Sequence, residues 1–207
     1  MKTYLDMDNY PRREHFEYFA AMRSPYMGGT VEIDVTDFLS ALKAKGYPFF
    51  LSFLWCVSRA ANSVPELRQR IEGGRIAEYG ACRSSHTLAL PDGTYCYCLL
   101  SDEPPLAEFI PYARAEQERA RRERSLSDGE DPLEPYFIST TPWFSFTSLI
   151  QPVPEPADSN PRFTWGKYFE RSGRVILPFA SLCNHALVDG LHMGLFLERL
   201  SGLMRGV

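Results

Sequence analysis

The sequence predicts an α/β fold, a two-layer sandwich in which helices pack on a mixed β-sheet. Segments with helical and strand-like patterns are interspersed along the chain, and several strands are joined by short turns. Turn-joined strands fit a mixed sheet better than a doubly wound parallel sheet, in which helices make the connections. We expect a single domain over residues 1–207, because 207 residues with 44% hydrophobic side chains suffice for one substantial core.

Helices and one strand are predicted in the first part of the chain. A helix begins at Pro11, because proline suits the first helical turn. Thr30–Val35 alternates apolar and polar side chains, which predicts a strand. A short helix follows from about Thr36 and ends near Gly46, a residue type that favours helix C-termini. Phe49–Ala61 is almost wholly apolar and long enough to be a buried helix.

The middle of the chain contains a hairpin signal. Two strand-like runs, Thr87–Leu90 and Thr94–Leu100, flank the turn sequence Pro91-Asp92-Gly93. Phe109–Arg124 then has the pattern of a helix, and Ser125–Pro135 is a polar loop.

The last part of the chain predicts more strands and a closing helix. Three strand-like runs are found at Trp143–Ile150, Phe163–Phe169 and Arg174–Cys183. Between the first two, Gln151–Pro161 is rich in proline and is an irregular connection. Glu170–Gly173 is a turn between the last two. Leu191–Met204 is amphipathic and predicts a helix.

Charge and hydropathy argue against nucleic-acid and membrane partners. The net charge is −4, and acidic residues interrupt the one strong basic run, Arg114–Arg124, so it is read as a solvated helix face. No stretch approaches the roughly 18 apolar residues of a membrane span. The N-terminus also lacks the apolar core of a signal peptide.

Cysteine usage favours a reducing, cytoplasmic setting with free thiols. The chain has five cysteines, an odd number, and no CxxC pair. Cys96 and Cys98 alternate within a strand-like run. No further ligands occur at a recognisable spacing, so no metal site is expected.

The segment Cys183–Gly190 is a first candidate for chemistry, because it joins a strand to a helix. If the strand continued, His185 would project from the end of a largely apolar row that includes Leu177 and Phe179. A partly buried imidazole there would be neutral and able to accept a proton near pH 7. The alternative is structural: Asp189 is also a good helix N-cap, and a histidine at a strand end often has no catalytic role.

The run Trp143–Ser148 is a second candidate. Alternation would place Ser148 on one face with Phe144, Phe146 and Ile150. A hydroxyl on an apolar face needs a partner, since leaving it unpaired costs about 1–3 kcal/mol. It is either a donor aimed at a reaction intermediate or a serine bonded to backbone. A nucleophilic role is disfavoured, because the chain has no G-x-S-x-G motif.

Several segments together resemble the chloramphenicol acetyltransferase family of CoA-dependent acyltransferases. The resemblance is carried by Pro142–Ser148, by His185-x-x-x-Asp189-Gly190-x-His192, and by Arg12–Glu17 near the start. Gly166–Tyr168 and the Leu177-Pro178 pair also fall where the family has similar residues. The pattern can be followed over nearly the whole chain. The H-x-x-x-D-G signature is shared by several CoA-dependent acyltransferases, whereas the other segments favour the narrower family.

The resemblance implies a catalytic scheme. It implies a homotrimer with active sites at subunit interfaces, with acetyl-CoA as co-substrate and a small hydroxylated acceptor. His185 matches the general base, which takes the proton of the acceptor hydroxyl as its oxygen attacks the thioester. Ser148 matches the donor to the oxyanion of the tetrahedral intermediate, and such a donor contributes about 2.7–4 kcal/mol to the barrier. Thr164 matches a threonine that holds the intermediate through water.

The resemblance also assigns supporting residues. Asp189 and Arg12 match a buried ion pair that maintains the shape of the histidine loop, so Asp189 is a scaffold residue and not a member of a charge-relay triad. Lys167 and Tyr168 match positions near bound CoA.

The chain departs from the family pattern at several positions. Phe19 stands where the better-known enzymes have a tyrosine that contacts the acceptor, and the stretch ending at Tyr26 is one residue longer. Phe19 and Tyr26 are therefore only weakly expected to line the acceptor pocket. Asn184 replaces a second histidine that is not the base. Pro48 replaces a lysine that lies near CoA phosphate.

Three functions are compatible with these observations. The first is O-acetylation of chloramphenicol, an antibiotic-resistance activity, by direct transfer in a ternary complex. The second is acylation of a different small hydroxylated acceptor. The third, least favoured, is a non-catalytic trimeric binding module. A dihydrolipoamide acyltransferase core shares the general mechanism, but the chain has no room for lipoyl and linker domains before the catalytic unit.

Overall fold

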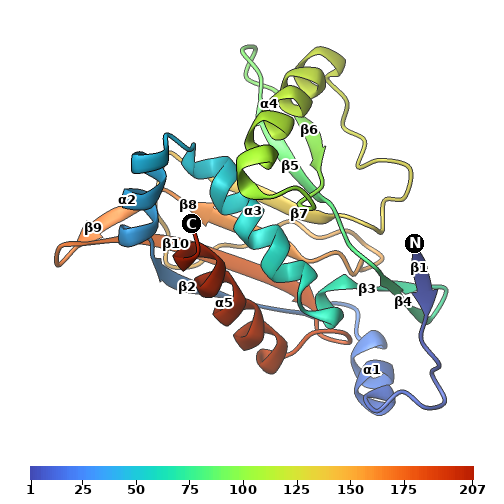
Figure 1. The fold of residues 1–207 in the computed structure, drawn as a ribbon. Coiled ribbons are helices and arrows are strands. Elements are labelled where there is room, and N and C mark those ends of the chain that lie inside the picture. Colours follow the sequence, from blue (N-terminus) through green and yellow to red (C-terminus); the bar gives the residue numbers. More distant parts are fainter.

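The computed structural model describes residues 1–207 and is built around a seven-stranded mixed sheet (Figure 1). Its strand order is β2-β10-β8-β7-β5-β6, and the short β9 also pairs with β10. The pairs β5–β7 and β7–β8 are parallel, and the other pairs are antiparallel. The strands are β2 (Tyr26–Asp34), β5 (Ser84–Ala89), β6 (Tyr95–Leu100), β7 (Tyr136–Thr141), β8 (Arg162–Gly166), β9 (Phe169–Arg171) and β10 (Arg174–Asn184). The predicted fold class is confirmed.

Helices pack on one face of this sheet (Figure 1). In chain order the helices are α1 (Arg13–Ala20), α2 (Thr36–Lys45), α3 (Phe49–Asn62), α4 (Leu106–Glu123) and α5 (Gly190–Arg205), with a 3₁₀ turn η1 (Pro65–Arg68) after α3. The helix α1 lies apart from the other four, at one end of the molecule (Figure 1). None of these helices has the length and apolar character that crossing a bilayer would require.

A small antiparallel sheet lies beside the main one. It has three strands in the order β1 (Lys2–Tyr4), β4 (Arg75–Tyr79) and β3 (Gln69–Glu72). No strand was predicted in these segments. They are only three to five residues long, which is too short for a clear alternating pattern.

The core forms where alternate residues of the central strands meet α3 and α5. On β8, Phe163 stacks on Phe196 of α5 with ring centroids 4.9 Å apart, and Trp165 meets Phe53 of α3 edge to face at 5.0 Å. Thr164, between these two aromatic residues, therefore points to the opposite face of the sheet. That opposite face carries no helix.

Most predicted elements are confirmed by the structure. The buried helix and the hairpin are present as α3 and the β5–β6 pair. The helix predicted from Thr36 is α2, and it ends at Gly46 in the left-handed conformation (φ 67°) that glycine allows. The helix predicted over Phe109–Arg124 begins earlier, at Leu106.

The predicted strand Trp143–Ile150 is wrong. The strand in this part of the chain is β7, which ends at Thr141, and the segment that follows is irregular. Pro142 explains the end of the strand, because proline cannot donate a ladder hydrogen bond. The predicted strand Phe163–Phe169 is also divided, with Lys167 and Tyr168 between β8 and β9.

A buried histidine outside the predicted site makes stability depend on pH. His86 on β5 is 1% exposed, and the side-chain amide of Gln117 on α4 lies 3.0 Å from its Nε2. Burial lowers the pKa of His86 from 6.5 to about 4. The unfolded chain therefore binds this proton more tightly than the native protein, and stability falls as the pH drops below 6.5.

We predict that lowering the pH from 7 to 5 costs about 2 kcal/mol through His86 alone. His86→Gln, which cannot titrate, should remove that part of the pH dependence. Urea unfolding of both proteins at pH 7 and pH 5 measures the difference. Equal losses of unfolding free energy in the two proteins would contradict the prediction.

Candidate functional site

The His185 loop is closed by backbone and side-chain groups of Asn184. The Asn184 carbonyl accepts the N–H groups of Leu187 at 3.1 Å and Val188 at 3.0 Å. Its side-chain oxygen accepts the N–H of Ala186 at 3.1 Å. Asn184 is the last residue of β10 and is buried, so it joins a rigid strand to a tight turn. The sequence identified this residue only as a departure from the family pattern.

The imidazole of His185 is held in one tautomer. Its Nδ1 lies 2.9 Å from the carbonyl oxygen of Val188, and a carbonyl can only accept, so Nδ1 carries the proton. The lone pair is then on Nε2. The ring of Phe19 lies over the imidazole with centroids 4.0 Å apart, and the His185 backbone N–H donates to Pro25 at 2.6 Å. This arrangement suits a general base.

The predicted ion pair is present and supports the same loop. Arg12 Nη2 lies 3.0 Å from Asp189 Oδ2, and Arg12 Nη1 donates to the Leu187 carbonyl at 2.7 Å. The pair is partly exposed, not buried as expected, with 22% and 36% of the two side chains accessible. Burial raises the pKa of Asp189. His192, the Leu191 N–H and Arg12 together lower it by more than burial raises it, so the pKa lies below its usual value.

Asp189 also caps α5. Its Oδ1 accepts the N–H of Leu191 at 2.9 Å. The structural role that the sequence left open is therefore present together with the ion pair, and neither makes Asp189 a partner of the His185 ring.

A second group of predicted residues lies elsewhere on the sheet. Thr164 is buried on the face without helices, and its hydroxyl donates to Gln151 Oε1 at 3.0 Å. Ser148 is exposed in the single chain. In the sequence, Ser148 lies between Phe146 and Gln151, and Gln151 accepts the Thr164 hydroxyl. The ring of Phe146 packs closely on Gly166 of β8, because a Cβ added to Gly166 would be 2.9 Å from that ring. Ser148 and Thr164 therefore belong to the same region.

Lys167 and Tyr168 lie beyond this region. The Lys167 backbone N–H donates to Phe144 at 2.9 Å. The exposed ring of Tyr168 meets Phe49, the first residue of α3, with centroids 5.7 Å apart. The start of α3 and this pair of residues form one neighbourhood, and Pro48 is the N-cap of α3.

Tyr26 lies at the other end of the sheet, opposite Asn184 in the β2–β10 register. Its hydroxyl donates to Asp158 Oδ1 at 3.1 Å and accepts the Asp158 N–H at 2.9 Å. Burial, followed by the charge of Asp158, raises the pKa of Tyr26 to about 12. The hydroxyl is thus engaged within the chain.

The predicted site residues form two groups that a single chain does not bring together. In the β8–β10 register, Thr164 is opposite Ala180, and His185 lies five residues further along, which corresponds to about 17 Å. The helix α1 next to His185 and the strand β9 next to Tyr168 lie at opposite ends of the molecule (Figure 1). One group contains the imidazole of His185, and the other contains the hydroxyls of Ser148 and Thr164.

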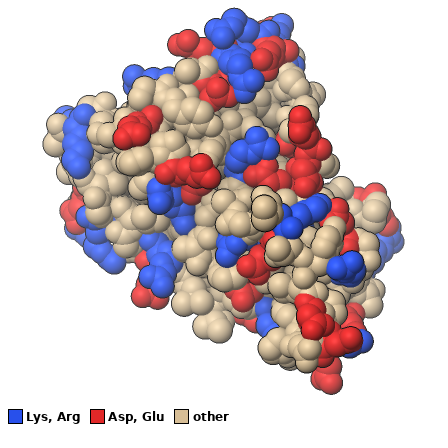
Figure 2. Space-filling view, turned by 45° about the vertical axis from the view of Figure 1, so that its right-hand side comes forward, with Lys and Arg blue, Asp and Glu red and all other residues tan.

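The surface beside the second group is apolar. Trp143 is 75% exposed, Phe144 51% and Ile150 96%. Apolar side chains exposed side by side in a chain segment are typical of an interaction surface. On the face drawn in Figure 2, by contrast, acidic and basic side chains are interspersed and form no single basic patch.

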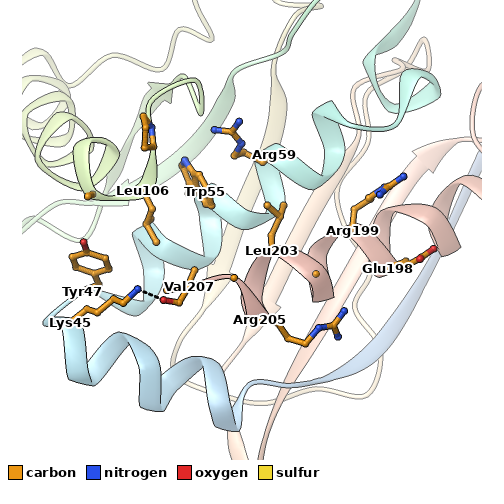
Figure 3. A pocket seen from close by; sticks show the side chains of 14 residues that line it. Lys45, Tyr47, Trp55, Arg59, Leu106, Glu198, Arg199, Leu203, Arg205 and Val207 are labelled. Atoms are coloured by element: carbon orange, nitrogen blue, oxygen red, sulfur yellow. Dashed lines mark hydrogen bonds between the residues drawn. The ribbon is translucent and has the colours of Figure 1, made fainter.

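A cavity of about 940 Å³ lies away from His185, Ser148 and Thr164. It lies among Trp55 of α3, Leu106 of α4 and Leu203 in the C-terminal half of α5, with Lys45 bonded to the terminal Val207 at its edge (Figure 3). The helix α5 has 16 residues and is about 24 Å long, and His185 precedes its other end. None of the predicted site residues lines this cavity.

No cysteine is placed to act as a nucleophile next to His185. Cys183 is 1% exposed, and burial raises its pKa to about 12. All five cysteines are free and buried. No group of three or more His, Cys, Asp or Glu side chains is placed to hold a metal ion.

Comparison with known proteins gives a consistent result. The family model described as chloramphenicol acetyltransferase matches residues 1–201. A chloramphenicol acetyltransferase of Streptomyces acrimycini is 28% identical over 204 residues, covering 97% of this chain and 93% of that protein. An Escherichia coli chloramphenicol acetyltransferase is 28% identical over 202 residues, covering 96% and 91%.

Solved structures agree in fold. A chloramphenicol acetyltransferase structure superposes with a TM-score of 0.87 and 27% identity, covering 99% of this chain and 100% of that one. A probable dihydrolipoamide acetyltransferase from Listeria monocytogenes has a TM-score of 0.69 at 18% identity, covering 95% and 92% of the two chains, which shows a shared fold alone.

We predict that Asp189→Ala destabilises the protein by about 2 kcal/mol, because it removes a helix cap and leaves Arg12 without its carboxylate. Asp189→Asn keeps a capping oxygen and should cost less than half as much. Thermal unfolding of the two variants and the wild type measures this order. An alanine variant that melts like the wild type would count against the ion pair.

Proposed function

Because the chain belongs to the chloramphenicol acetyltransferase family and is an acyltransferase, we propose that it transfers the acetyl group of acetyl-CoA to a hydroxyl of chloramphenicol. The observation that carries the proposal is the Nδ1–H bond from His185 to Val188, which leaves Nε2 as a lone-pair base. A single catalytic domain over residues 1–207 performs the reaction.

In the proposed reaction both substrates bind before transfer. His185 Nε2 removes the proton of the acceptor hydroxyl as its oxygen attacks the thioester carbonyl. The resulting oxyanion accepts a hydrogen bond from Ser148, while Thr164, oriented by Gln151, acts through water. The intermediate then collapses to the acetyl ester. The departing CoA thiolate takes the proton back from Nε2, which restores the neutral base.

The active site forms between copies of the chain in a homotrimer. Thr164 lies about 17 Å from His185 along the sheet, and Ser148 belongs to the Thr164 group, so the base and the oxyanion donor of one site come from two copies. The exposed apolar residues Trp143, Phe144 and Ile150 support this assembly, because burying them against a neighbour is favourable. Arg12 and Asp189 maintain the loop that presents His185.

Acetyl-CoA binds as a substrate near Lys167 and Tyr168. The fit rests on an exposed aromatic ring beside a lysine and next to the first turn of α3. A tyrosine ring can stack on the adenine, and an ammonium group and free helical N–H groups suit phosphate. Pro48 supplies no charge here, so Lys167 carries more of the phosphate recognition.

The acceptor occupies the space next to Phe19, which lies on His185. The alternative is a different small hydroxylated acceptor. It is favoured by the absence of a hydroxyl on Phe19 and by the engagement of the Tyr26 hydroxyl with Asp158. We place the enzyme in the cytoplasm, in keeping with its free buried thiols.

The proposal predicts chloramphenicol-dependent release of free CoA thiol from acetyl-CoA. His185→Ala should abolish release, and Ser148→Ala should reduce kcat by about 10²–10³-fold. Mass spectrometry of the product locates the added acetyl group. No thiol release with chloramphenicol, together with release on another alcohol, would support the alternative acceptor. Turnover that survives in His185→Ala would contradict the mechanism.

We predict that two inactive variants complement each other. If His185 of one copy meets Ser148 of the next, trimers formed from equal amounts of His185→Ala and Ser148→Ala chains recover about a quarter of the wild-type activity. The two chains carry different tags and are co-expressed, with each variant alone as the control. Mixed trimers as inactive as the single variants would exclude a site shared between copies.

A further inference from the structure

One peptide group joins the His185 ring to a second histidine. The carbonyl of Val188 accepts from His185 Nδ1 at 2.9 Å. The N–H of the same peptide, which belongs to Asp189, donates to Nδ1 of His192 at 3.0 Å. His192 is 6% exposed in the first turn of α5. The two imidazoles are therefore connected through a single amide plane.

The tautomer of His192 follows from its partners. A backbone N–H can only donate, so Nδ1 of His192 carries the lone pair and Nε2 carries the proton. Nε2 lies 3.6 Å from Oε1 of Glu66 in η1. Arg12 Nη1, which has two N–H groups, donates to Leu187 at 2.7 Å and also lies 3.5 Å from Nε2, so the Arg12 contact to His192 is the longer of its two. At 3.6 Å the Glu66 carboxylate acts on the His192 ring through its charge and not through a hydrogen bond.

Asp189 does not replace this connection. Its carboxylate lies beside His192, with Oδ1 3.0 Å from Nδ1, but Oδ1 accepts the Leu191 N–H and Oδ2 binds Arg12. The charged groups around His192 are therefore Asp189 from its own helix, Glu66 from η1 and Arg12 from the start of α1. His185 Nδ1 itself meets only a neutral carbonyl.

We infer that His192 and Glu66 are positioning residues for the base, in a relay that runs from Glu66 through His192 and the Val188–Asp189 peptide to His185. This inference rests on the proposed function of His185. When His185 takes the acceptor proton, the imidazolium strengthens its Nδ1–H bond to Val188. A peptide whose N–H is already donated is a better acceptor at its carbonyl, because hydrogen bonds in a chain polarise one another. The Glu66 carboxylate orients and polarises the far end of that chain.

The chain offers variants that separate the links. Glu66→Gln removes the charge and retains the shape. His192→Asn retains an oxygen near the position of Nδ1 but does not reach Glu66. His192→Leu removes the acceptor. Glu198→Gln, elsewhere on α5, is the control for losing one carboxylate.

We expect Glu66→Gln and His192→Asn each to lower kcat about three- to tenfold with KM and the melting temperature nearly unchanged. His192→Leu should lower kcat further, and Glu198→Gln should have no effect. Glu66→Gln made in the His192→Asn background should cause no additional loss, because the link is already broken. An equal loss in both backgrounds would show a through-space charge effect and overturn the relay.

A second measurement needs no turnover and so separates this inference from the proposed function. In NMR spectra of the unliganded protein, the His185 Nδ1–H proton should move upfield in Glu66→Gln and His192→Asn, reporting a weaker bond to Val188. An unchanged resonance would overturn the relay even if the enzyme acetylates chloramphenicol. A shifted resonance in a protein that is inactive with chloramphenicol would sustain the relay and refute the acceptor instead.

Discussion

The architecture of the site depends on the pairing of one central strand. β10 pairs over nine residues with β2 and holds β8 on its other side, so its register decides where each end of the sheet presents side chains. Near the His185 end this register requires glycine, because a Cβ on Gly28 would lie 2.3 Å from the Ser181 carbonyl. The strand then leads into the turn that Asn184 closes. His185, the proposed base, is therefore positioned by backbone pairing, with little freedom in the loop itself.

The chemistry around the base is supplied by neutral and shared groups. No carboxylate bonds directly to the His185 ring. A backbone carbonyl fixes its tautomer, and the charges of Arg12, Asp189 and Glu66 act one step removed. Because the partner of the His185 ring is a neutral carbonyl, the orientation of that one peptide determines the tautomer and the position of the ring. In the proposed mechanism, the surrounding hydrogen bonds are therefore part of what positions the base.

Local patterns predicted most of the fold, and long-range contacts account for what was missed. The apolar run of α3, the glycine after α2 and the hairpin turn are each encoded within a few neighbouring residues. The irregular path after Pro142 is set by packing on Gly166, a residue distant in sequence. His185, Ser148 and the Arg12–Asp189 pair followed from family resemblance. Gln151 and Glu66 carried no motif, because their roles arise only from partners brought near by folding.

The separation of the two groups has a consequence for how assembly relates to turnover. If each chain offers its base to one neighbour and its oxyanion donor to the other, the contact is head-to-tail, and it leaves no unmatched half only when the ring closes. An open pair of chains would hold a single complete site, with one base and one donor facing solvent. Closing the ring would then make every chain productive at once, so specific activity would report the stage of oligomer formation.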